Sequence, residues 1–297
     1  MENSNTENLN VENLNSQKSQ DKFEILCVGG GSIRGFCELG ALFYLESEEI
    51  YNMENIHTVI GTSIGSVISL LLVVGYSPME ILTKANRIDK FVDFEATDIL
   101  NFKEDGGLLN FNSFLKIIET LINQKIKRIP TLKELYELTC KRLIITTTNV
   151  SKKCTEYLDY INNPDLNCLD AIKMSCSIPL VFKRVKYNDC YYVDGGLLDN
   201  FPIEFVNDFK TKIIGISVES SERETDSFIN YIDTLFTLPI LKIQNNVIKE
   251  KITKNCLVIN MIINNTPIID FNLNKNFKIE MFVNGYEIAK EKYFSWF

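Results

Sequence analysis

The sequence predicts an α/β fold of three layers, in which helices cover both faces of a mainly parallel central sheet. Short runs rich in β-branched residues alternate along the chain with longer segments of helical periodicity. Glycine-rich turns join two of these runs to the helices that follow them. The 297 residues are 45% hydrophobic and 24% charged, which is enough apolar material for a sizeable core.

The first part of the chain shows this alternation twice. Residues 23–28 are predicted as a strand, and a helical pattern extends from 36 to about 47. Residues 58–62 are predicted as the next strand, and the apolar residues 64–74 as a helix. Pro78 then suits the first turn of another helix.

The remaining elements follow from similar patterns. Residues 112–123 carry apolar side chains at helical spacing. Thr131 with Glu134 three positions later is the capping-box pattern that begins a helix. Further strands are predicted at 142–148, 191–193, 213–218 and 257–263, and a last helix at 278–294.

The chain divides into a leader and one domain. Residues 1–20 are dominated by asparagine, glutamate and serine and have few apolar side chains, so we expect a disordered leader. We expect residues 21–297 to form a single α/β domain. All the motifs described below lie within 23–205, and residues 206–297 add helices and strands without a motif.

Charge and residue counts exclude several function classes. Lysine and arginine number 31 against 39 acidic residues, a net charge of −8, which argues against a nucleic-acid partner. The single histidine, His57, excludes a metal site built mainly on imidazoles. None of the eight cysteines forms a C-x-x-C pair, so a zinc ribbon is not expected. We expect neither a metal nor another cofactor.

We expect a cytoplasmic protein without a signal peptide or transmembrane helix. The cysteines are scattered through apolar stretches, as reduced thiols in a cytosolic protein are. Residues 55–79 lack formal charge and are long enough to span a membrane. The small residues 61–66 in their middle favour a buried strand, a turn and a buried helix instead.

The aromatic tail has two interpretations. Tyr293, Phe294, Trp296 and Phe297 suit transient contact with a membrane surface. The alternative, which we favour, is a terminal helix that packs on the domain.

The run Gly61-Thr62-Ser63-Ile64-Gly65 matches G-x-S-x-G. In that motif a sharp turn from strand to helix projects the serine hydroxyl above the sheet, and the flanking glycines relieve crowding. The amide of Ile64 then lies at a helix N-terminus, well placed to stabilise an oxyanion. By itself the pentapeptide leaves a nucleophile and a structural turn equally open.

A second small-residue turn follows the first strand and reads Gly29-Gly30-Gly31-Ser32-Ile33-Arg34-Gly35. A dinucleotide loop would need a third glycine where Arg34 stands, and a Walker loop would need G-K-[ST]. Two interpretations remain: an oxyanion hole of successive backbone amides, or a tight turn without a ligand. Arg34 either supports the loop through hydrogen bonds or is solvated.

A nucleophilic serine needs a proton acceptor, and His57 is the wrong candidate. It precedes the strand 58–62 whereas Ser63 follows it, a separation of roughly 20 Å. A carboxylate must therefore act directly. Asp105 follows a polar loop and is expected in a turn, whereas Asp194 ends the strand-like run 191–193, at the edge where parallel sheets place their chemistry. We favour Asp194.

Residues around Asp194 fit that choice. Gly195 and Gly196 would leave room beside the carboxylate for the serine and a bulky ester. Asn200 and Pro202 then introduce another helix.

Together these motifs resemble the patatin-like phospholipase family. The family pattern is a G-G-G-x-[RK]-G loop, then G-x-S-x-G, then D-G-[GA], and here residues 29–35, 61–65 and 194–196 occur in that order. Residues 171–182 are similar to the family's small-residue helix that ends in a proline and an aromatic residue. If Arg34 and Gly35 are aligned with the family's basic residue and glycine, Ser32 takes the place of the third glycine, which would cost about 1 kcal/mol or more if its φ is positive. The alternative is a loop one residue longer than the family's.

The resemblance implies the patatin-like variant of the serine hydrolase architecture, covering residues 23–205. It further implies a serine lipid acyl hydrolase for phospholipids or related lipids, with Ser63 as nucleophile, Asp194 as base and no cofactor. Amides of Gly30, Gly31 and Ile64 would then bind the oxyanion. The alternatives are an acyltransferase or thioesterase that uses the same dyad, and an inert scaffold or binding protein of the same fold.

Overall fold

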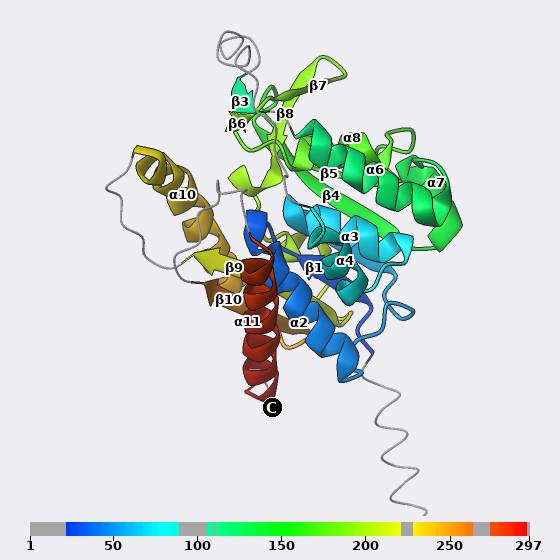
Figure 1. Ribbon diagram of the computed structural model, residues 1–297, viewed down its shortest axis with the longest axis vertical. Coiled ribbons are helices and arrows are strands. Elements are labelled where there is room, and N and C mark those ends of the chain that lie inside the picture. Colours follow the sequence, from blue (N-terminus) through cyan, green and yellow to red (C-terminus); the bar gives the residue numbers. More distant parts are fainter. Residues whose placement is uncertain (1–21, 89–105, 110, 221–227, 264–273, 296–297) are drawn as a thin grey trace, which may run out of the picture.

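The computed structural model describes residues 22–88, 106–109, 111–220, 228–263 and 274–295 (Figure 1). The expected leader 1–20, Asp105, Trp296 and Phe297 lie outside these residues. Statements about structure below refer to the described ranges.

A central sheet of eight strands forms the middle layer. Its order is β10-β9-β1-β2-β4-β8-β7, with β5 paired to β4. The five strands from β10 to β4 are mutually parallel, whereas β5, β7 and β8 form an antiparallel edge. The strand bounds are β1 Ile25–Val28, β2 Thr58–Thr62, β4 Arg142–Asn149, β5 Cys154–Leu158, β7 Val185–Tyr187, β8 Cys190–Asp194, β9 Ile213–Ser220 and β10 Cys256–Ile263.

The helices link the strands of this sheet and cover it. Their bounds are α2 Gly35–Ser47, α3 Ile64–Val74, α4 Pro78–Ala85, α6 Asn112–Ile126, α7 Leu132–Thr139, α8 Cys168–Ser175, α9 Ile203–Val206, α10 Phe228–Glu250 and α11 Lys275–Phe294. Two 3-10 turns, η1 Ser32–Arg34 and η2 Gly195–Leu197, and a small sheet of β3 Gly107–Leu109 with β6 Leu180–Phe182 complete the described elements.

Strand side chains are buried on both faces of the sheet, as the three-layer prediction requires. Leu26 and Val28 of β1 point into the larger core beneath α2, α3 and α11. Ile25 and Cys27 of the same strand join a smaller core on the other face, with residues of α9 and the last turns of α10. This alternation follows from the two-residue period of a strand.

Helices α2 and α11 cross at close range and run side by side in Figure 1 (blue and red). A Cβ atom on Gly40 would lie 1.9 Å from the carbonyl oxygen of Phe282, and one on Gly285 would lie 2.0 Å from that of Cys37. Tyr44 of α2 stacks edge-on against Tyr286 of α11 at 5.2 Å. The last helix therefore packs on the domain. Phe294 at its end is 68% exposed, and Trp296 and Phe297 of the tail lie outside the described residues.

Most predicted elements are confirmed, including the capping box at the start of α7. Helix α4 also begins with a capping box, which was not predicted. Three differences stand out. Residues 107–109 form β3 and not only a turn, the irregular strands β5 to β7 were not predicted, and α10 was missed. Helix α10 contains Pro239 in its interior. Proline disfavours the interior of a helix, so the sequence did not indicate a helix there.

Within the described ranges no helix taken singly combines the length and apolarity of a membrane span; α3 and α4 reach that threshold only as a pair bent by 119°. All eight cysteines are free, and five of them are buried while Cys140 is exposed.

Candidate active site

The strand register brings Ser63 and Asp194 to the same level of the sheet. Thr62, the last residue of β2, pairs with Thr146 of β4, and the next residue of β4, Thr147, pairs with Asp194 of β8. The position predicted for Asp194 is therefore correct, but the reason is different. Strand β8 is antiparallel to β4, so Asp194 reaches the edge because β8 runs back along the part of β4 that extends beyond β2.

Ser63 occupies a sharp turn between β2 and α3. Its φ is 53° and its ψ is −125°, a conformation that residues with a Cβ atom rarely adopt. Its amide donates to Ser175 Oγ at 2.9 Å, and that hydroxyl donates to the carbonyl of Thr146 at 2.7 Å. Ser175 thus connects the turn to β4 through hydrogen bonds, and its Oγ is the acceptor for the amide of Ser63.

The turn is possible only because Gly61 and Gly65 lack side chains. A Cβ atom on Gly65 would lie 2.2 Å from the carbonyl oxygen of Gly29, and one on Gly61 would lie 2.5 Å from the carbonyl oxygen of Gly65. The backbone of the serine turn is therefore in direct contact with residues 29–35, called the glycine loop below.

The hydroxyl of Ser63 donates to Oδ2 of Asp194 at 2.5 Å. The other carboxylate oxygen, Oδ1, accepts from the amide of Gly196 at 2.7 Å. Burial raises the pKa of Asp194 to about 6, against the opposing effects of the hydrogen bonds from Ser63 and Gly196. A carboxylate with this pKa is ionised at neutral pH yet basic enough to accept a hydroxyl proton during a reaction.

The glycine loop differs from the expectation in its amides. Gly29 donates its amide to Ile216 O at 2.8 Å, and Gly30 donates its amide to Asn200 O at 2.9 Å. The assignment of Gly30 to the oxyanion hole is therefore corrected, since its amide already has an acceptor. In the described part of the chain no hydrogen bond is present to the amides of Gly31 and Ile64.

The end of the loop is built on Ser32, Arg34 and Gly35. Ser32 has a φ of 52°, so a serine does stand where the left-handed conformation favours glycine. Arg34 is buried, and its Nε donates to the carbonyl of Gly31 at 3.1 Å, which is incompatible with a solvated side chain. A Cβ atom on Gly35 would approach Ile64 to 2.7 Å, so α2 begins against the first residue of α3.

The glycines after Asp194 do not leave room for an ester, and that expectation is corrected. A Cβ atom on Gly195 would lie 2.4 Å from the carbonyl oxygen of Thr146. One on Gly196 would lie 2.7 Å from Asn200 Oδ1. The space beside the carboxylate is thus filled by β4 and by Asn200.

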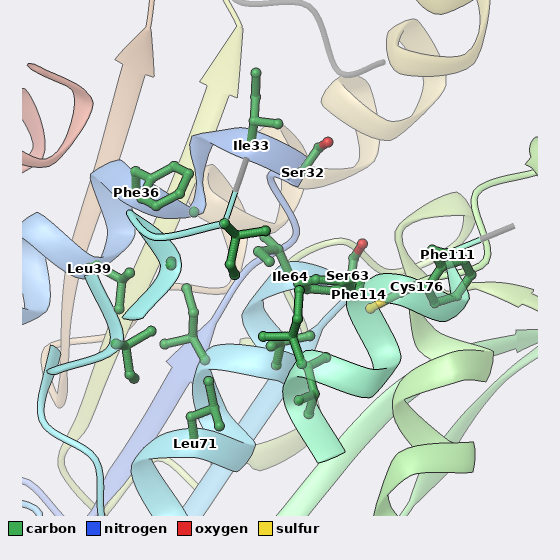
Figure 2. A pocket seen from close by; sticks show the side chains of 18 of the residues that line it. Ser32, Ile33, Phe36, Leu39, Ser63, Ile64, Leu71, Phe111, Phe114 and Cys176 are labelled. Atoms are coloured by element: carbon green, nitrogen blue, oxygen red, sulfur yellow. The ribbon is translucent and has the colours of Figure 1, made fainter. Parts of the chain in front are cut away.

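A cavity of about 120 Å³ opens beside Ser63, between α2, α3, α4 and α6 (Figure 2). Apart from Ser32, Ser63, Gly35 and Cys176, its lining residues are aliphatic or aromatic. Figure 2 shows Leu71 at the end of the view opposite Ser32. Leu71 lies two turns of α3 beyond Ser63, about 12 Å along the helix axis. The cavity is therefore an elongated apolar space with the hydroxyl of Ser63 on its wall.

His57 lies at the other end of β2 from Ser63. Its Nε2 is 3.1 Å from Glu24 Oε2, and its side chain is 53% exposed. Among the described side chains no group of three or more His, Cys, Asp or Glu is arranged to hold a metal ion. The group that accepts the hydrogen bond of the Ser63 hydroxyl is the carboxylate of Asp194.

The motifs, their order and this geometry agree with a match to a protein-family model. The model described as patatin-like phospholipase matches residues 26–206. The chain belongs to the patatin-like phospholipase family. A "probable lipid hydrolase 463L" of Invertebrate iridescent virus 6 is 34% identical over 193 residues, which are 64% of this chain and 65% of the viral protein. The matched part is thus just under two thirds of that relative's length.

Solved structures share the fold. VipD of Legionella pneumophila superposes with a TM-score of 0.56 at 16% identity over 93% of this chain and 67% of VipD. ExoU of Pseudomonas aeruginosa, solved with SpcU, gives 0.55 at 13% identity over 93% of this chain and 53% of ExoU. The patatin-like α/β architecture therefore extends beyond the residues that the family model matches.

Two residues of the site were not assigned a role from sequence. Ser175 lies within the 171–182 segment and holds the Ser63 amide, and Asn200 contacts the glycine loop. The spacing of Asn200 after Asp194 placed it near the site, but only the structure shows which atoms it binds.

Proposed function

We propose that this protein is a serine lipid hydrolase that cleaves fatty-acyl esters of phospholipids or related lipids through a Ser63–Asp194 dyad. The proposal rests on one observation: the 2.5 Å hydrogen bond from Ser63 Oγ to a buried carboxylate on the wall of an apolar cavity. Family membership and the relative named as a probable lipid hydrolase support the same class of reaction.

In the proposed reaction Asp194 accepts the Ser63 proton while Oγ attacks the ester carbonyl carbon. The amides of Gly31 and Ile64 are the proposed oxyanion donors, and the N-terminus of α3 adds its dipole. Collapse of the tetrahedral intermediate releases the alcohol, which takes the proton from Asp194. Water then attacks the acyl-serine while Asp194 accepts a proton from it. The bond between the acyl carbon and Ser63 Oγ breaks, Asp194 returns the proton to Oγ, and the fatty acid is released.

The cavity supports an acyl chain as the bound group. Its hydrocarbon walls favour an aliphatic chain through the hydrophobic effect, and none of the described residues that line it offers a charged partner for a polar head group. The chain would extend along α3 while the head group stays outside.

A serine-directed fluorophosphonate tests the nucleophile. We expect labelling and ester hydrolysis by the native protein and neither by Ser63→Ala. Ser69→Ala is the matched control, because Ser69 is a buried serine of α3, the helix that follows Ser63, and its hydroxyl makes no hydrogen bond within the described structure. Retained hydrolysis in Ser63→Ala would overturn the proposal.

The acceptor of the acyl group is a separate question with a separate assay. Product analysis with a lysolipid or alcohol present distinguishes a hydrolase, which releases free fatty acid, from an acyltransferase, which forms a new ester. We expect free fatty acid as the main product.

A further inference from the structure

Asn200 forms hydrogen bonds with both the amide and the carbonyl of Gly30 in the glycine loop. Its carbonyl accepts from the amide of Gly30 at 2.9 Å, and its Nδ2 donates to the carbonyl of Gly30 at 3.0 Å. Its Oδ1 lies in the space that a side chain on Gly30 or Gly196 would need. Asn200 therefore sits between the glycine loop and the turn that carries Asp194.

The two hydrogen bonds between Asn200 and Gly30, called the clamp below, determine the direction in which the Gly31 amide points. The carbonyl of Gly30 and the N–H of Gly31 belong to one peptide group, and no described peptide bond is cis. In a planar trans peptide these two groups point in opposite directions. Holding the carbonyl of Gly30 toward Asn200 thus directs the Gly31 amide away from Asn200.

The side-chain amide of Asn200 is held in turn by α10. Gln244 accepts from Asn200 Nδ2 at 2.7 Å through Oε1, and its Nε2 donates to Ser217 Oγ at 2.7 Å. Gln244 is only 1% exposed, so water does not compete for these bonds.

The carboxylate of Glu219 determines which end of the Gln244 side-chain amide faces Asn200. Glu219 Oε1 lies 3.4 Å from Gln244 Nε2 and accepts from Asn260 at 2.7 Å. Because a carboxylate only accepts, the Nε2 end of Gln244 must face Glu219 and its Oε1 must face Asn200. The orientation of Asn200, and with it the Gly30–Gly31 peptide, follows.

We propose that Gln244 is a positioning residue, which acts through Asn200 to orient the Gly31 amide toward the developing oxyanion. The proposal rests on the proposed hydrolase function. It gives α10, which lies outside the part of the chain that the family model matches, a role in the reaction without contact to the substrate.

The chain offers a matched pair of variants for the test. Gln244→Met keeps the side-chain length and removes the bonds to Asn200, Ser217 and Glu219. Asn245→Leu, at the next position of α10, removes a bond to Glu219 (3.4 Å) but none to Asn200. Both variants are compared with the native full chain by thermal unfolding and then assayed on a p-nitrophenyl fatty-acyl ester.

We expect Gln244→Met to lower kcat about tenfold with little change in KM, less than the 10²–10³ lost when an oxyanion donor is removed outright. An alkyl trifluoromethyl ketone, which forms a tetrahedral adduct with serine, should bind more weakly by the same factor. Asn245→Leu should stay within about twofold in both measurements. Gln244→Met in an Asn200→Ala background should add nothing further, because the effect passes through Asn200.

Three results would overturn the proposal: an unchanged kcat in Gln244→Met, a loss that appears only in KM, or an equal loss in Asn245→Leu. If the native protein hydrolyses no ester, the proposed function has failed and the clamp is tested separately by hydrogen–deuterium exchange of residues 29–35. Faster exchange in Gln244→Met but not in Asn245→Leu supports the clamp, and unchanged exchange overturns it.

Discussion

The hydroxyl of Ser63 lies 2.5 Å from the carboxylate of Asp194, although 131 positions separate the two residues in the chain. Strand β4 brings the two residues together because it pairs with both β2 and β8. The parallel strand β2 ends just before Ser63, the antiparallel strand β8 ends at Asp194, and these ends pair with consecutive residues of β4. Burial of this pair and the cavity beside it lead to three predictions, and the backbone conformation of Ser32 leads to a fourth.

The first prediction concerns the pH dependence of hydrolysis. Burial raises the pKa of Asp194 to about 6, and only the ionised carboxylate can accept the Ser63 proton. We expect kcat/KM to fall below about pH 6 and to reach a plateau above it. His57→Ala should leave this profile unchanged, because His57 lies at the far end of β2. A profile that shifts in His57→Ala would contradict the assignment of Asp194 as base.

The second prediction concerns stability in Asp194→Asn. The pKa of Asp194 is higher in the folded protein than its ordinary value of 3.8, so the folded state holds this proton more tightly than the unfolded state. The group's favourable contribution is therefore present below about pH 4 and is lost as pH rises through about 6.

Asp194→Asn lacks this titration. The free energy of unfolding of the variant relative to the native protein should rise by about 2 kcal/mol between pH 4 and pH 7. Urea unfolding at several pH values measures the difference, with activity lost throughout. A difference that does not vary with pH would show that the carboxyl has an ordinary pKa in the folded state.

The third prediction concerns chain length. Leu71→Phe adds bulk about 12 Å from Ser63 along α3, where a long acyl chain would end. We expect the ratio of kcat/KM for a sixteen-carbon ester to that for a four-carbon ester to fall about tenfold or more, since lost burial of each methylene weakens binding by about 0.8 kcal/mol. An unchanged ratio would mean that the acyl chain binds elsewhere.

The fourth prediction concerns Ser32, whose φ is 52°. Ser32→Gly relieves the left-handed conformation and should raise the free energy of unfolding by about 0.5–1 kcal/mol. Lys127→Gly is the reference, because Lys127 is exposed at the end of α6 with a φ of 66°. Thermal unfolding compares the two. A destabilised Ser32→Gly beside a stabilised Lys127→Gly would show that contacts of the serine outweigh its strain.

Local patterns predicted much of this fold because they reflect short-range physics. The strand 58–62, the apolar helix 64–74 and the capping box at Thr131 depend on residues within a few positions of each other. Strands β5, β6 and β7 were missed because they are short, and helix α10 was missed because Pro239 interrupts its pattern. Their structure depends on what they pack against.

The sequence by itself determined the order of the motifs, the serine on a strand-to-helix turn, and the separation of His57 from that serine. Those features depend on spacing along the chain. Only the tertiary structure decided that β8 is antiparallel, that Gly195 lies against β4, and that Asn200 occupies the amide of Gly30. Each of these depends on the register of strands and turns distant in sequence, which hydrogen bonds and packing fix only when the chain has folded.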